Sequence, residues 1–218
     1  MPEAIMIGSF VLKTSLLILV VSFVIGVIFF WFTSSIDKKE KSGYLDQVTS
    51  MLLSFILTLI GSKILLNWSL FLDDPIAVLA FPSNSTSFYI AFVGLLAYMG
   101  YTVKVKNKSF TTMSLSFFIV FLMSSFSFLI GQLLLLRMDV SLIELSVHFL
   151  LLMMWILFQA KMKEQSIVGV MIIIFGSIKL ALSFFSTMFL FTFPLHSWFY
   201  FLLIVLGLLL FFIRKGRE

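Results

Sequence analysis

The sequence contains no cysteine, only four prolines and few charged residues, and these shortages exclude several classes of protein. Without cysteine there is no disulfide framework, no thiolate nucleophile and no cysteine metal site. Charged residues make up 11% of the 218 positions and hydrophobic residues 61%, a balance that rules out a soluble core. A chain this apolar, with 28 phenylalanines, needs lipid as its solvent. The composition therefore predicts a polytopic membrane protein.

The positive charges are spread unevenly along the chain. Eleven of the 15 lysines and arginines fall in four short polar gaps between long apolar stretches. Segments that alternate with these gaps, such as 72–88 and 189–197, hold almost no positive charge. Because cytoplasmic loops of membrane proteins are rich in lysine and arginine, we expect the N-terminus outside and the C-terminus in the cytoplasm. The clustered residues are Lys38, Lys39, Lys41, Lys104, Lys106, Lys108, Lys161, Lys163, Arg214, Lys215 and Arg217.

Seven apolar stretches approach the roughly 20 residues that a transmembrane helix needs. We expect a single all-α domain over residues 1–218, and an odd number of spans agrees with ends on opposite sides. In the long outer connection, the apolar segment Ile76 to Phe81 predicts a short helix on or dipping into the outer leaflet. The first stretch lacks a basic segment and a cleavage site, so we interpret it as a retained helix. The predicted spans are Ile7–Phe32, Val48–Leu70, Phe88–Val103, Thr111–Leu136, Leu142–Ala160, Ile167–Met188 and Trp198–Ile213.

Three lysines, Lys13, Lys63 and Lys179, lie inside apolar stretches. A charge within a span is expensive and marks a functional site by default. With the expected topology, all three lie in the outer half of the membrane, where acidic residues such as Glu144 and Asp139 are few. The surplus of positive charge predicts a site for a phosphate or another anionic headgroup. Snorkelling of each lysine to the interface is the alternative.

Other polar residues of the outer layer join these lysines. Gln132 ends the fourth apolar stretch and Arg137 follows it, so both are candidate headgroup ligands. Glu144 suits a helix start or a lysine partner, and His148 suits a hydrogen bond between helices. The two share one helix face, and together with Tyr89 they are the candidate catalytic residues. We expect no metal or other cofactor, because no HxxxH, HExxH, P-loop or GxGxxG pattern occurs.

Short motifs at these positions occur in the order found in a known enzyme family. The first, IGSFVLK at residues 7–13, is similar to the family's opening segment, and FLIGQL at 128–133 is similar to its signature. With these motifs the chain resembles the prolipoprotein diacylglyceryl transferases, which move diacylglyceryl from phosphatidylglycerol to a lipoprotein cysteine. The resemblance implies the family fold in a bacterial plasma membrane, with a phosphatidylglycerol-like lipid and a lipoprotein precursor as partners. The remaining matching segments are 43–46, 60–63, 74–75, 86–91, 141–144 and 175–186.

The residues that carry the family's reaction are mostly replaced. Tyr89 stands at the essential histidine, Ser124 at the essential arginine and Gln132 at the signature glutamate. Diacylglyceryl transfer to a thiol needs a base and a clamp for the phosphate, and serine supplies neither. The resemblance therefore implies the fold without the reaction. Further replacements fall at Ser15, Ser127, Lys179, Ser183 and Ser186.

Three functions remain open from the sequence. We favour a non-catalytic relative that binds an anionic phospholipid headgroup or a lipoprotein signal helix at the outer leaflet. The first alternative is an active diacylglyceryl or acyl transferase with an active site rebuilt from Tyr89, Glu144 and His148. The second is a structural subunit whose partner is another membrane protein. Nucleic acid is excluded, because the lysines of the cytoplasmic loops suit anionic lipid and form no basic face on a folded domain.

Overall fold

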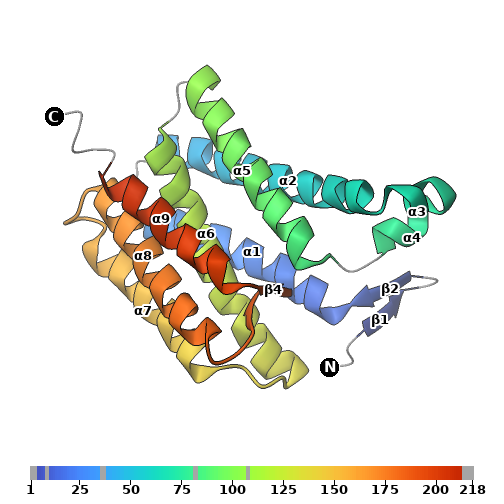
Figure 1. The fold of residues 1–218 in the computed structure, drawn as a ribbon. Helices are drawn as coiled ribbons and strands as arrows, with labels where there is room; N and C mark the ends of the chain where they lie inside the picture. The colour runs from blue at the N-terminus through green and yellow to red at the C-terminus, as the bar shows by residue number, and fades with distance from the viewer. Residues whose placement is uncertain (1–3, 8–9, 35–37, 81–82, 107–108, 213–218) are drawn as a thin grey trace.

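A computed structural model of the chain describes residues 4–7, 10–34, 38–80, 83–106 and 109–212. Within these ranges every predicted apolar stretch contains a long helix (Figure 1). Ile213, the predicted end of the last span, and the basic residues at 214–217 lie outside the described residues. The long helices are α1 (Thr14–Thr33), α2 (Lys38–Leu66), α5 (Ser85–Lys106), α6 (Phe110–Gly131), α7 (Leu142–Phe158), α8 (Glu164–Ser183) and α9 (Ser197–Phe212).

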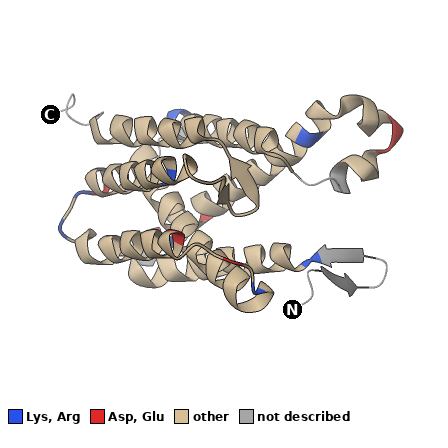
Figure 2. Ribbon diagram, turned by 60° about the horizontal axis from the view of Figure 1, so that its bottom comes forward, with Lys and Arg blue, Asp and Glu red and all other residues tan. Residues whose placement is uncertain are grey.

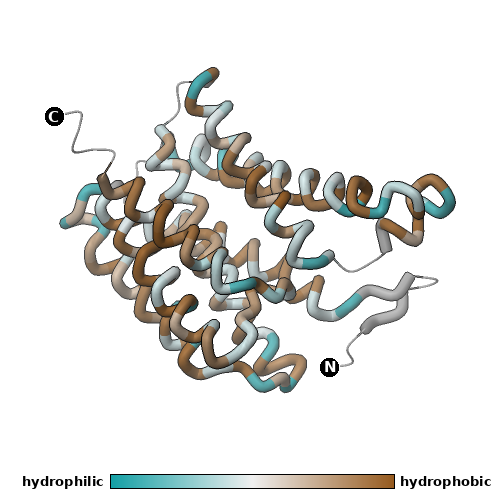
Figure 3. The backbone as a smooth tube through the Cα atoms, in the orientation of Figure 1, coloured by the Kyte–Doolittle hydropathy of each residue, from teal (hydrophilic) through white to brown (hydrophobic). Residues whose placement is uncertain are grey.

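The described helices form a membrane protein with several spans. Five of them are long and apolar enough to cross a membrane, and the apolar helices α7 and α9 are shorter. Their outward surfaces are also apolar, as at Val20, which is 62% exposed. Charged residues gather at the helix ends and in the connections, whereas the helix bodies are hydrophobic (Figures 2 and 3). This distribution suits a protein whose sides face lipid.

The two ends of the helices differ. Helices α1, α5 and α7 end, and helices α2, α6 and α8 begin, at one end of the molecule (Figure 1). We call it the basic end because Lys41, Lys104 and Lys161 are there. The opposite end carries two short β-hairpins and the connection from α2 to α5. We call it the hairpin end.

The hairpins correct two predicted spans. The first span begins at Thr14, because β1 (Ala4–Ile7) and β2 (Phe10–Lys13) pair antiparallel before it. The sixth span ends at Ser183, and β3 (Met188–Leu190) pairs with β4 (Phe193–Leu195) after it. Strands of three or four apolar residues merge with an adjacent helix in a hydropathy pattern, which is why both hairpins were missed.

The connection from α2 to α5 contains the predicted short helix. It is α4 (Pro75–Ala80), and Phe81, the last residue of the prediction, lies outside the described residues. Its start has a local cause, since Asp74 Oδ1 accepts a hydrogen bond of 3.0 Å from the Ala77 amide and proline follows Asp74. A second short helix, α3 (Trp68–Asp73), precedes it and was not predicted.

Small residues set which helices pack together. A Cβ atom on Gly26 of α1 would lie 2.3 Å from Ser124 Oγ of α6, and one on Gly94 of α5 would lie 2.6 Å from Thr58 of α2. Helices α8 and α9 approach each other in the same way through Gly169, Gly176 and Gly207. Small residues commonly allow such close packing of membrane helices. Gly61 of α2 makes no such contact, because a Cβ atom there would meet nothing within 4 Å.

The contrast between these glycines gives a test of the packing. Gly26→Ala should lower the free energy of unfolding by about 1–3 kcal/mol, because the added methyl group pushes α1 away from the α6 backbone. Gly61→Ala is the matched control, and it should be neutral or stabilise by up to about 1 kcal/mol. Unfolding in mixed detergent micelles, followed by tryptophan fluorescence, measures both. Equal effects would contradict the packing described.

Candidate functional site

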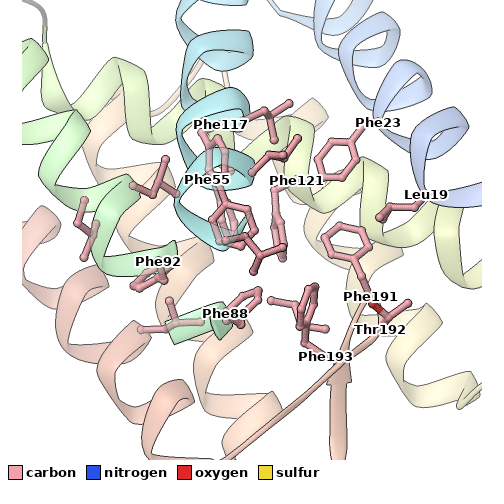
Figure 4. A pocket seen from close by; sticks show the side chains of 18 of the residues that line it. Leu19, Phe23, Phe55, Phe88, Phe92, Phe117, Phe121, Phe191, Thr192 and Phe193 are labelled. Atoms are coloured by element: carbon pink, nitrogen blue, oxygen red, sulfur yellow. The ribbon is translucent and has the colours of Figure 1, made fainter. Parts of the chain in front are cut away.

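A cavity of about 1180 Å³ lies among the helices. Helix α1 packs on α6 and α2 packs on α5, so α1 and α2 stand on opposite sides of it although they are consecutive in the chain. Helices α8 and α9 and the turn between β3 and β4 complete the wall (Figure 4). The volume exceeds the roughly 300–1,000 Å³ of ordinary small-molecule pockets.

The wall of the cavity is apolar and rich in aromatic rings. Among the described residues two charged side chains line it, and both are lysines at the hairpin end: Lys13 where α1 begins and Lys63 near the end of α2. Lys13 is exposed and Lys63 is half-buried. The phenylalanines of the wall are Phe23, Phe55, Phe88, Phe92, Phe110, Phe117, Phe118, Phe121, Phe175, Phe191, Phe193 and Phe199.

The cavity reaches the lipid-facing surface between α1 and α2. Val20 on α1 and Ile56 on α2 both line it, and they are 62% and 48% exposed. At the basic end the two helices are tied together, because Lys41 Nζ donates a hydrogen bond of 2.8 Å to the Trp31 carbonyl. The opening therefore runs along the helices from this tie towards the two cavity lysines.

Lys179 is separate from this site. Its side chain is 2% exposed, and Nζ lies 2.5 Å from Glu144 Oε1 and 3.5 Å from the Phe189 carbonyl oxygen. Pairing of Glu144 with a lysine was one of the predictions, and it is confirmed. The expectation that Lys179 contributes to one headgroup site with Lys13 and Lys63 is corrected, because Lys179 does not line the cavity and the Glu144 carboxylate compensates its charge.

His148 is also enclosed. Its side chain is fully buried, and Nδ1 lies 2.7 Å from the Glu144 carbonyl oxygen. Since a carbonyl only accepts, Nδ1 carries the proton, and the buried Nε2 makes no hydrogen bond within the described residues. The Phe175 ring, which lines the cavity, lies 5.6 Å from the His148 ring and 6.0 Å from Lys179 Nζ. Phe175 thus stands between the cavity and this buried polar group.

Tyr89 lies apart from both the cavity wall and the Lys179–Glu144 pair, at the hairpin end. Its hydroxyl oxygen accepts a hydrogen bond of 2.9 Å from the His196 amide, and its ring lies 4.4 Å from that of Trp198. Among the described residues no hydrogen bond joins Tyr89 to Glu144 or His148. The structure thus brings two of the three candidate catalytic residues into contact and leaves the third with the last helix.

Gln132 and Arg137, the other candidate headgroup ligands, stand away from the cavity wall. Gln132 begins a π-helical turn, η1 (Gln132–Leu136), and Arg137 ends it with a φ of 54° and an exposed side chain. Neither lines the cavity. The sequence analysis missed the phenylalanine wall and the β3–β4 turn. The abundance of phenylalanine was a signal for such a wall, but it did not say which rings face inwards.

Comparison with models of known protein families finds no match, and comparison with curated proteins finds none.

The buried ion pair gives the second prediction. Lys179→Met and Glu144→Gln should each lower the free energy of unfolding by about 3–5 kcal/mol, because each leaves one uncompensated buried charge. The double variant should regain most of that loss, since it buries no charge. Lys13→Met is the control, with an expected change within about 0.5 kcal/mol because Lys13 is exposed. A double-mutant cycle measured by unfolding in detergent checks this. Additive losses would rule out the pairing.

Proposed function

We propose that the chain binds an anionic phospholipid of the bacterial plasma membrane without transforming it. The observation that carries the proposal is the polarity of the cavity: two lysines at one end and phenylalanine along the rest. A phosphatidylglycerol-like lipid has the same division, with a phosphate at one end and acyl chains at the other. Lys13 and Lys63 contact the phosphate in this proposal, and the aromatic wall contains the chains.

Physical chemistry favours this occupant over a lipoprotein signal helix. A basic residue near anionic lipid contributes about 1 kcal/mol. A signal segment carries positive charge in its own N-terminal region and small residues before its cleavage site. It therefore offers the two lysines no anion. The opening between α1 and α2 faces lipid, from which a phospholipid arrives without crossing water.

The contacts of the candidate catalytic residues support lipid binding rather than transfer of a diacylglyceryl group. Glu144 is engaged by Lys179, His148 is closed off behind Phe175, and the Tyr89 hydroxyl is bonded to the His196 amide. None of the three lines the cavity where the lipid is proposed to lie. A non-catalytic relative of the diacylglyceryl transferases accounts for the short motifs and for this arrangement together. Turnover of phosphatidylglycerol with a lipoprotein peptide would overturn that part of the proposal.

The proposal includes seven spans, with the basic end in the cytoplasm. Helices α7 and α9 have 17 and 16 residues, which correspond to about 25 Å, against a hydrocarbon core of about 30 Å. Short spans are accommodated by local thinning of the bilayer and by flanking residues. With this topology Lys13 and Lys63 lie at the depth of the outer headgroups.

Lipid retention tests the binding site. The double variant Lys13→Met/Lys63→Met should retain roughly 30-fold less phosphatidylglycerol, the equivalent of about 2 kcal/mol for two lysines. Native mass spectrometry of the purified protein measures retained lipid. Lys161→Met is the control, because Lys161 is exposed at the basic end and does not line the cavity. Equal retention by both variants, or a stoichiometric protein partner in place of lipid, would contradict the proposal.

Because the chain has no cysteine, single introduced cysteines test the topology cleanly. His196→Cys at the hairpin end should react with a membrane-impermeant maleimide in intact cells. Lys161→Cys at the basic end should react only after the membrane is permeabilised. Both positions are exposed, so access alone does not distinguish them. Labelling of both cysteines from the same side would show that the number of spans between them is even.

A further inference from the structure

The turn between β3 and β4 places a bulky residue where the backbone favours glycine. Leu190 pairs with Phe193, so Phe191 and Thr192 form a two-residue turn. Phe191 has a φ of 54°, in the left-handed region. The favoured two-residue hairpin turns have positive φ at their first central position, where glycine, asparagine or aspartate is the usual residue. A phenylalanine in this conformation is a strained exception, of the kind that clusters at ligand-contacting sites.

The ring of Phe191 explains what holds this conformation. It lies 5.3 Å from the ring of Phe23 on α1, and 5.6 and 5.5 Å from those of Phe121 and Phe128 on α6. Phe191 lines the cavity, as do Phe23 and Phe121 (Figure 4), whereas Phe128 is buried and does not. The turn thus inserts an aromatic ring into the cavity wall where α1 packs on α6.

The base and the tip of the hairpin are held differently. Polar contacts anchor its strands. Ser85 Oγ donates a hydrogen bond of 2.5 Å to the Pro194 carbonyl oxygen, and Lys179 Nζ lies 3.5 Å from the Phe189 carbonyl oxygen. The contacts described for the Phe191 ring are with other aromatic rings. Ring contacts of this kind contribute about 0.5–1.5 kcal/mol each and lack the directionality of hydrogen bonds. Polar contacts therefore hold the strands of the hairpin, and the contacts described for the ring at its tip are aromatic.

We propose that Phe191 is a specificity-determining residue, which narrows the cavity and selects unbranched over bulky acyl chains. The proposal rests on the proposed function, since it assumes that acyl chains occupy the cavity. The fixed hairpin base determines where the ring stands, and the ring determines the width left beside α1. A methyl-branched chain must push the ring out of its aromatic contacts, whereas an unbranched chain passes beside it.

Competition between two lipids tests this selectivity. Purified protein in detergent is offered equal amounts of phosphatidylglycerol with unbranched palmitoyl chains and with methyl-branched phytanoyl chains. Native mass spectrometry then counts the bound species. The unaltered protein should prefer the unbranched lipid by at least about tenfold, the discrimination that one methyl group produces in an apolar pocket. Phe191→Gly and Phe191→Ala should both abolish that preference while keeping lipid binding.

Controls separate the possible failures. Phe201→Ala removes a lipid-facing ring from α9, so it should leave the preference intact. Lipid binding with no preference in the unaltered protein, or a preference that persists in both Phe191 variants, would overturn the role of Phe191 and leave the proposed function standing. If the unaltered protein binds neither lipid, the proposed function itself fails, and this inference fails with it.

The same two variants test the strained backbone. Glycine adopts positive φ without strain and alanine does not, so Phe191→Gly should melt at a higher temperature than Phe191→Ala. At an unstrained position the order is reversed, because glycine gives the unfolded chain more conformational freedom. Higher melting of Phe191→Ala would overturn the proposed positioning of the ring by a strained turn.

Discussion

The close approach of helix backbones at small residues is the constraint on which the rest of the structure depends. Gly26 brings α1 against Ser124 of α6, and Gly94 brings α5 against Thr58 of α2. Each contact is possible only because no larger side chain intervenes. Helix α1 packs on α6 and α2 packs on α5, and within the described residues these two consecutive helices do not pack against each other along their lengths. The cavity between them follows from that pairing.

Lys179 differs in its surroundings from Lys13 and Lys63. Lys179 forms an ion pair with Glu144, which joins α7 to α8, and it reaches the Phe189 carbonyl oxygen. Its charge therefore takes part in holding the fold together. Burying such a pair is favourable only when both partners are present and well placed. Lys13 and Lys63 instead face a cavity in which the described wall carries no acidic residue. One ion pair therefore steadies the hairpin that carries Phe191, and two other lysines give the cavity its polarity.

The helices were predictable from the sequence, and the site was predictable only in part. Apolar stretches of about 20 residues have few alternatives in a chain with this little charge, which is why every predicted stretch contains a long helix. Hydropathy gives the depth of a residue but not the face of its helix. Lys13, Lys63 and Lys179 were therefore placed at one depth, while the direction of Lys179 towards Glu144 was not visible. The β3–β4 hairpin was not predicted, because strands of three apolar residues such as Met188–Leu190 give no periodicity that distinguishes them from the connection around them.

A structure determined in a lipid nanodisc containing phosphatidylglycerol tests the central claim most directly. The account predicts continuous acyl-chain density inside the phenylalanine-lined cavity, entering between α1 and α2, with the phosphate beside Lys13 and Lys63. Density for lipid around the outer surface alone, with the cavity closed by its own side chains, would contradict it. So would a phosphate seated at the basic end beside Lys41 and Lys104.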